Sequence, residues 1–294
     1  MKASIGDYVL LHVIVFLWGT TAVISKLVSV PATEMLFFRT LAAAIGLLVL
    51  ALATRTSLRA SGSDLLKMLG IGFIVGIHWV AFFVSAQITT VSISLIGFAT
   101  CSLWAAILEP IVNKQRIRGI ELFLGVLVLS GLYIIFHFEF RFYAGLLLSV
   151  LSGFLAAVFS VMNFHLVRRT SATSIAFWEM TGAFLLVTAF LPVYRDHFAA
   201  DGILRMSLVP MDWLYIGFMS IVCSVFAFTM SVQLMKKVSV FTVQLTLNLE
   251  PVYGIFLALM VLGEGQYMGW SFIAGAGLIM SAVLSYPLLK NRFT

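Results

Sequence analysis

Residues 81–125 read "AFFVSAQITTVSISLIGFATCSLWAAILEPIVNKQRIRGIELFLG" and align without a gap with residues 231–275, which read "SVQLMKKVSVFTVQLTLNLEPVYGIFLALMVLGEGQYMGWSFIAG". In this register Gly119 lies opposite Gly269. Nearer the start of each half, a slightly smaller shift places "PATEMLFFRTLAAA" (31–44) on "SATSIAFWEMTGAF" (171–184). The chain therefore contains an internal repeat.

The composition is that of a membrane protein. The chain has 294 residues, of which 62% are hydrophobic and 10% charged, and its mean hydropathy is +1.09. Soluble domains carry about 25% charged residues and about 45–50% apolar ones. The basic pI near 9.5 does not indicate nucleic-acid binding, because the cations stand singly or in small groups between apolar runs. We expect no nucleic-acid partner and a lipid bilayer as the solvent.

Apolar runs long enough to span a membrane fill most of the chain. A transmembrane helix needs about 20 predominantly apolar residues. Ten runs meet this criterion, at residues 8–28, 33–53, 66–87, 91–112, 119–137, 142–167, 172–192, 211–233, 239–262 and 267–290. The sequence predicts an all-α integral membrane protein with ten transmembrane helices.

The distribution of positive charge predicts the orientation. Cytoplasmic loops of membrane proteins are enriched in Lys and Arg. Of the 18 Lys and Arg residues, thirteen fall on the side of the N-terminus, three on the other side (Arg141, Arg195 and Arg205), and two (Lys26 and Arg39) within predicted spans. We therefore expect a multi-pass protein of the cell (inner) membrane with both termini in the cytoplasm.

The repeat also predicts how the halves relate. Residues 1–138 and 139–294 each contain five predicted spans. An odd number of spans inserts the second copy upside down relative to the first. Inverted repeats are common in secondary transporters, whose substrate site lies near the membrane midplane between the repeats. We expect two inverted five-helix repeats.

Several motifs resemble those of a known family. "LWGTTAVISK" (17–26), "FFRTLAAA" (37–44) and "LEPVYGIFLALMVLGE" (249–264) followed by "GWSFIAGAGLIMSAVL" (269–284) are similar to signatures of the EamA branch of the drug/metabolite transporter superfamily. The first half departs from the family pattern, because "IVNKQRIRG" (111–119) lacks the terminal Gly-Glu pair. The resemblance implies a ten-helix exporter of amino acids, metabolites or drugs.

A carboxylate, Glu250, stands in the middle of the apolar run 239–262 and is followed directly by Pro251. A charged side chain at the bilayer centre costs about 2.5–3.5 kcal/mol on insertion scales, so it should face a cavity or a partner. Pro251 breaks the backbone ladder, which is tolerated where a helix lines a cavity. Helical spacing places Tyr253 on the Glu250 stripe. One interpretation is a substrate or proton site; the other is a structural polar cluster.

Further polar residues lie inside predicted spans. Arg39 and Glu179 occupy equivalent repeat positions, with Arg39 near the external face, and could form two halves of a gate or pair locally. Arg39 could instead hold a substrate carboxylate or anchor the helix. His78 is suited to proton exchange near neutral pH, although a lone His is often a satisfied interior residue. Glu264 is expected at an external helix end.

Together these residues define a predicted site. The predicted cavity lining is Trp18, Arg39, His78, Trp79, Trp178, Gln244, Asn248, Glu250 and Tyr253. The candidates for proton coupling are Glu179, Glu250 and His78.

The motifs of other functional classes are missing from the sequence. It has no Walker motif, no HExxH and no GxSxG, and its two cysteines lie in apolar runs, where we expect free buried thiols. We therefore expect no enzyme activity, no cofactor and no metal. The leading hypothesis is a secondary transporter that exports small organic solutes by alternating access, with proton coupling as an option. The alternative is a non-transporting receptor or membrane assembly subunit, which a sealed core at Glu250 would favour.

Overall fold

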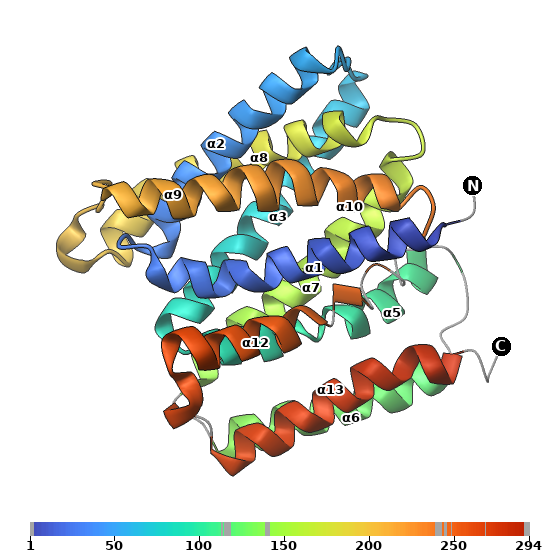
Figure 1. Cartoon of the computed structure of the whole chain (residues 1–294), viewed down its shortest axis with the longest axis vertical. Helices are drawn as coiled ribbons and strands as arrows, with labels where there is room; N and C mark the ends of the chain where they lie inside the picture. Colours follow the sequence, from blue (N-terminus) through green and yellow to red (C-terminus); the bar gives the residue numbers. More distant parts are fainter. Residues whose placement is uncertain are drawn as a thin grey trace.

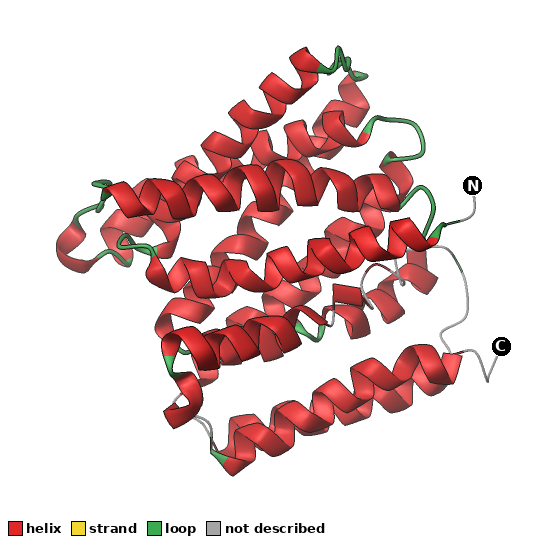
Figure 2. Ribbon diagram, in the orientation of Figure 1, coloured by secondary structure: helices red, strands yellow, loops and turns green. Residues whose placement is uncertain are grey.

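The computed structural model describes residues 3–112, 114, 119–138, 142–238, 243, 246–247, 249–267 and 269–290. Within these ranges all regular secondary structure is helical (Figure 2). The first half contains α1 (Ile5–Leu27), α2 (Ala32–Ala53), α3 (Gly62–Ile88), α4 (Val91–Phe98), α5 (Cys101–Val112) and α6 (Gly119–Phe138). The second half contains α7 (Tyr143–Leu166), α8 (Ala172–His197), η2 (Ala200–Gly202), α9 (Pro210–Phe218), η3 (Met219–Phe228), α10 (Thr229–Leu234), α12 (Leu249–Leu262), η4 (Glu264–Tyr267) and α13 (Trp270–Lys290).

Seven segments of the described chain are long and apolar enough to cross a membrane. They are Ile5–Leu27, Ala32–Ala53, Gly62–Ile88, Val91–Val112, Tyr143–Leu166, Ala172–His197 and Pro210–Leu234. Of the other three predicted spans, 119–137 coincides with the helix α6. The runs 239–262 and 267–290 have gaps in their description, and there α12 and Trp270–Ala282 form shorter apolar helices. That the chain has ten transmembrane helices stays a prediction.

Polar side chains set the starts of several helices. The hydroxyl of Ser4 accepts a hydrogen bond from the backbone N–H of Asp7 while the Asp7 carboxylate accepts one from the backbone N–H of Ser4. Ser61, Thr90 and Ser171 cap α3, α4 and α8 in the same way with one side-chain oxygen each. Such caps satisfy backbone donors that the first helical turn leaves unpaired, so these boundaries follow from local sequence.

The long helices run roughly side by side between two ends of the molecule (Figure 1). We call the end at which α1 begins and α13 finishes the proximal end, and the opposite end, where α1 gives way to α2, the distal end. Helix α6 packs along α13, α3 packs on α7 and α8, and α1 packs on α12. The segment α9–η3–α10 continues as one rod that contacts α1 and α2.

Glycines permit close approach at two helix crossings. A Cβ atom at Gly72 of α3 would collide with the backbone of Glu179 on α8. A Cβ atom at Gly19 of α1 would lie 3.1 Å from the carbonyl oxygen of Glu250, and one at Gly254 of α12 would lie 3.0 Å from that of Gly19. Small residues let transmembrane helices pack backbone to backbone. The two buried acids therefore sit on tight crossings.

At the distal end, hydrogen bonds between side chains and backbone groups connect the helices. The backbone N–H and hydroxyl of Ser29 donate to the carboxylate of Asp212 at 2.9 and 2.5 Å. The ammonium of Lys26 donates to the carbonyl oxygens of Gln87 and Thr89 at 3.1 and 3.3 Å. These contacts tie α1 to the start of α9 and to the end of α3.

Glu264 adds a third distal contact. Its carboxylate accepts hydrogen bonds from the backbone N–H groups of Val91 and Ser92 at 2.7 and 3.0 Å, and from the Ser92 hydroxyl at 2.7 Å. The side chain is buried. Glu264 lies at a helix end as expected, and it caps the N-terminus of α4 in the other half of the chain.

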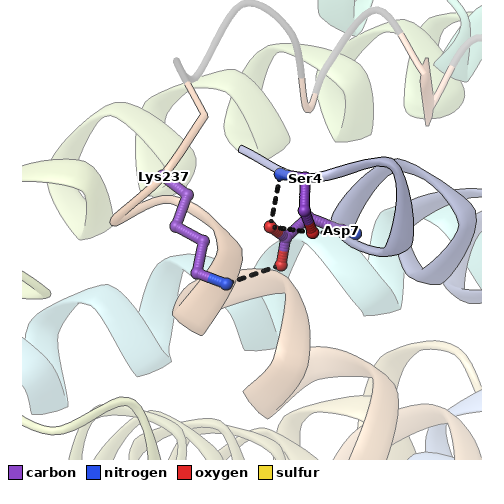
Figure 3. A network of polar contacts seen from close by, with 3 residues as sticks. All are labelled: Ser4, Asp7 and Lys237. Carbon is purple, nitrogen blue, oxygen red and sulfur yellow. Dashed lines mark hydrogen bonds and ion pairs between the residues drawn. The ribbon is translucent and has the colours of Figure 1, made fainter. Parts of the chain in front are cut away.

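The proximal end carries a looser polar contact (Figure 3). The ammonium of Lys237 lies 2.7 Å from a carboxylate oxygen of Asp7, whose other oxygen accepts from Ser4. The Lys237 side chain is 30% exposed. The contact joins the start of α1 to the segment after α10.

Candidate functional site

A cavity of about 70 Å³ lies between helices of both halves. Its walls come from α1, α2, α3, α4, α7, η3, α10 and α12. Five predicted site residues line it, namely Trp18, Arg39, His78, Trp79 and Glu250. Most of the remaining wall is apolar and aromatic, with Phe82, Phe83, Phe98, Phe159 and Phe228. The core at the level of Glu250 is therefore hollow.

Arg39 reaches this cavity from α2 with an incompletely bonded guanidinium. The side chain is only 2% exposed, and its Nε donates to the hydroxyl of Ser224 at 3.3 Å. The guanidinium carbon lies 4.2 Å from the ring centroid of Trp79 and 5.2 Å from that of Phe83, in cation–π geometry. Among the described residues, Nη1 has no hydrogen-bond partner. Arg39 thus offers a donor that is free among the described residues in an aromatic setting; its place near the external face stays a prediction.

The π-helical segment η3 holds two lining residues in place. The indole N–H of Trp18 donates to the carbonyl oxygen of Cys223 at 2.9 Å. The hydroxyl of Ser220 donates to the carbonyl oxygen of Arg39 at 3.1 Å, while Ser224 bonds the Arg39 side chain. π-Helical turns are rare and occur frequently at functional sites. The sequence analysis missed this segment, since only the small polar residues within an apolar run distinguish it.

Glu250 lies in the first turn of α12, is 5% exposed and lines the cavity. No hydrogen bond joins its carboxylate to any residue that the structure describes. Gln244 and Asn248, which were predicted to stand beside it, lie outside the described residues. The cationic Arg39 acts on it electrostatically from the same cavity. A buried carboxylate that accepts no hydrogen bond from the described residues is costly, so this group is disposed to bind a cation, a donor or a proton.

His78 lines the same cavity from α3. Its Nδ1 lies 2.9 Å from the backbone carbonyl oxygen of Ser152 and 2.8 Å from the hydroxyl of that residue. Because a carbonyl can only accept, Nδ1 is assigned as the protonated nitrogen. The other ring nitrogen is then an acceptor, and the ring packs against Phe98 and Phe159.

Glu179 does not line the cavity, but it touches a residue that does. It is fully buried in α8, and one carboxylate oxygen accepts a hydrogen bond from the amide of Asn163 at 3.1 Å. Its second oxygen and the Asn163 carbonyl oxygen have no partner among the described residues. Asn163 lines the cavity and was not predicted, although a lone Asn inside the apolar run 159–166 is a signal that could have found it.

Two predicted lining residues lie elsewhere. The indole N–H of Trp178 donates to the carbonyl oxygen of Leu58 at 3.0 Å, which ties α8 to the segment after α2. Tyr253 packs edge-on against Phe16, with ring centroids 5.6 Å apart. Neither side chain belongs to the lining. Residues three apart on a helix differ in direction by about 60°, which is enough to turn Tyr253 away from the cavity that Glu250 faces.

The described part of the chain offers no cluster of three His, Cys, Asp or Glu side chains that could hold a metal ion. Cys101 and Cys223 are both buried. The polar chemistry of the cavity rests on Arg39, His78, Asn163 and Glu250.

Comparison with known proteins identifies the family. The model of the EamA-like transporter family matches residues 6–137 and again residues 143–286. The chain belongs to the EamA-like transporter family. The resemblance predicted from the sequence motifs is thereby confirmed, and this EamA protein is a multi-pass membrane protein whose family is one of transporters.

Solved structures share the fold of this EamA chain. One, titled "Crystal structure of protein", has 18% sequence identity and a TM-score of 0.69, covering 97% of this chain and 98% of its own. At that identity the likeness shows the fold alone. A search of curated proteins finds no match.

Proposed function

We propose that this EamA protein is a secondary active transporter that exports a small organic solute across the cell membrane by alternating access. The observation that carries the proposal is the cavity between the two halves, with the carboxylate of Glu250 on its wall and with Nη1 of Arg39, which has no hydrogen-bond partner among the described residues. Substrate sites of inverted-repeat transporters lie between repeats. The cavity does not by itself distinguish a transporter from a receptor, which also binds its ligand in a hollow, so the two roles are separated by measuring flux.

The packing of the helices supports an inverted relation between the halves. In the alignment of the two repeats, α1 corresponds to α7, α3 to α9–η3–α10, and α4–α5 to α12. The contact of α1 with α12 then corresponds to that of α7 with α4–α5, and the contact of α3 with α8 to that of η3 with α2. The pair α6 and α13 maps onto itself. This pattern favours ten transmembrane helices in two inverted sets of five, at 1–138 and 139–294.

The cavity extends from the middle of the bundle toward the proximal end. Asn163 near the end of α7, Met235 after α10 and Val243 line its proximal part, while the distal end is closed by Asp212 and Glu264. The excess of Lys and Arg favours a cytoplasmic proximal end. We infer that the structure corresponds to a state that loads solute from the cytoplasm, as an exporter requires.

The side chains around the cavity favour a solute with polar groups of both signs and an apolar body. A buried donor without a partner costs about 1–3 kcal/mol, and a carboxylate bound to Nη1 of Arg39 would remove that cost. An ammonium group could approach Glu250, and aromatic walls such as Trp79 and Phe98 suit an apolar or cationic moiety. An amino acid or a related metabolite meets these requirements, and amphiphilic drugs are the next class.

We propose that proton coupling, where it occurs, involves Glu250, Glu179 or His78. Glu179 reaches the cavity only through Asn163, so it is suited to a relay and not to direct contact with solute. Glu179→Gln is expected to abolish transport driven by a proton gradient while it leaves solute exchange without a gradient intact. If solute flux through Glu179→Gln in liposomes depends on pH as it does in the wild type, Glu179 has no role in proton coupling.

A counterflow screen in proteoliposomes tests the proposed function. Vesicles loaded with an amino acid, a polyamine or an aromatic cation would be diluted into the labelled form of the same compound. We expect saturable accumulation for at least one class, and its loss in Glu250→Gln. Asp196→Asn, which removes an exposed acid paired with Arg195, serves as a matched control that keeps activity. Accumulation no faster than in protein-free vesicles for every class would favour the receptor or assembly role.

A further inference from the structure

A second hollow lies outside the central cavity, between α3, α5 and α7. It has a volume of about 270 Å³ and opens near the proximal ends of these helices. Its walls are apolar, with Ile71 from α3, Leu108 and Val112 from α5, and Val158 and Met162 from α7. Val112 and Met162 are 50% and 37% exposed. On the outer surface of a membrane protein such a groove faces acyl chains.

The mouth of this groove is basic. Lys67, His165 and Arg169 line it, and they stand near the first turns of α3 and at the end of α7. The Lys67 ammonium lies 3.8 Å from the partly buried carboxylate of Asp64, a loose contact. Arg169 has no carboxylate partner within the described ranges, and the buried Nε2 of His165 has no hydrogen-bond partner there. The ammonium of Lys67, the guanidinium of Arg169 and the ring of His165 thus lie around one groove, and among the described residues their only ion pair is the weak contact between Lys67 and Asp64.

We propose that this groove binds an anionic phospholipid, with an acyl chain against α5 and α7 and the phosphate between Lys67, His165 and Arg169. Basic pockets between transmembrane helices at the membrane–water interface bind acidic lipid headgroups. The apolar stems of Lys and Arg lie along the walls while the charges reach the headgroup level. Charge complementarity favours an anionic lipid. A zwitterionic lipid would place its own positive group beside the positive charges of Lys67 and Arg169.

The site would join the two halves of the chain. Helices α3 and α5 come from the first half and α7 from the second, and α7 packs on both. Through Asn163, α7 also contributes to the central cavity. A lipid in the groove therefore contacts a helix of the transport pathway, although its binding does not depend on the proposed transport function.

Native mass spectrometry of the full chain released from detergent tests the proposal. The protein would be titrated with phosphatidylglycerol and, separately, with phosphatidylcholine of identical acyl chains. A Lys or Arg near an anionic membrane contributes about 1 kcal/mol. We expect the wild type to prefer phosphatidylglycerol by on the order of tenfold, and the double variant Lys67→Gln/Arg169→Gln to lose this preference while it still binds both lipids weakly.

Two further variants make the outcome decisive. Arg59→Gln/Lys236→Gln removes two other exposed cations of the proximal end and should keep the preference. Val158→Trp fills the groove and should reduce binding of both lipids without changing their ratio. Equal binding of the two lipids by the wild type, or a preference that survives Lys67→Gln/Arg169→Gln, would overturn the proposal. Neither readout involves solute transport, so a failure here is distinct from a failure of the proposed function.

Discussion

The two ends of the helix bundle are held together by different chemistry. At the distal end, the buried carboxylates of Asp212 and Glu264 accept three hydrogen bonds each, and five of these six come from backbone N–H and serine hydroxyl groups of the other half. At the proximal end the halves meet through the partly exposed pair of Asp7 and Lys237, and the cavity extends toward that end. Under the proposed transport function, this difference would make the distal end the closed one and the proximal end the one that opens.

The repeat explains why the ends differ. The register that aligns residues 81–125 with 231–275 places Lys114 opposite Glu264. Glu264 caps the start of α4, whereas Lys114 is exposed, and an ammonium cannot accept from backbone N–H groups. The first half thus lacks the acid that would build the same clamp at the proximal end. This loss of symmetry follows from the missing Gly-Glu pair in the run 111–119.

Removing the distal clamp should have the largest effect. Glu264→Ala leaves the N–H groups of Val91 and Ser92 without an acceptor in a buried setting, at a cost of about 1–3 kcal/mol for each. We expect a clear fall in the thermal unfolding midpoint in detergent. Glu264→Gln keeps one carbonyl acceptor and should lie between Ala and the wild type. Equal stability of all three proteins would show that the clamp does not hold the distal end.

A change inside the cavity should have an intermediate effect, on solute affinity and not on stability. Arg39→Lys keeps the charge but loses the planar array of donors, so a carboxylate can no longer form paired hydrogen bonds. We expect half-saturation of counterflow to require on the order of tenfold more solute. The thermal midpoint should fall only slightly, and an unchanged affinity would remove Arg39 from the solute site.

The proximal pair should matter least. Partly exposed ion pairs contribute little to stability, so Lys237→Gln is expected to leave the thermal midpoint within the error of the wild type. A loss as large as that of Glu264→Ala would mean that the proximal end is clamped as firmly as the distal one, and the contrast between the ends would disappear.

Much of the fold was predictable because a membrane imposes simple rules. Run length and hydropathy located the helices, and motifs such as residues 249–264 indicated the family. The run 91–112 was predicted as one span, and the structure divides it into α4 and α5. Regular periodicity does not reveal such interruptions, because the residues around the break remain apolar.

The site was predictable mainly where a costly residue marks it. Glu250, Arg39 and His78 stand out because polar groups inside an apolar span need a reason to be there, and all three line the cavity, as do the predicted Trp18 and Trp79. Tyr253 was assigned by helical spacing alone and turns away. The carbonyl of Cys223 that anchors Trp18 belongs to the backbone of a π-helix, so no side-chain pattern could have indicated it.

The most direct test of the account is the reactivity of one cysteine inside the cavity from each side of the membrane. Thr21→Cys would be made with Cys101→Ala and Cys223→Ser, which remove the two buried native thiols; Thr21 lines the cavity from α1. A small, membrane-impermeant thiol reagent is expected to react from the proximal side at rest and from the distal side during transport, and a transported solute should slow both reactions. A thiol that reacts from neither side, or from one side only under every condition, would contradict alternating access through this cavity.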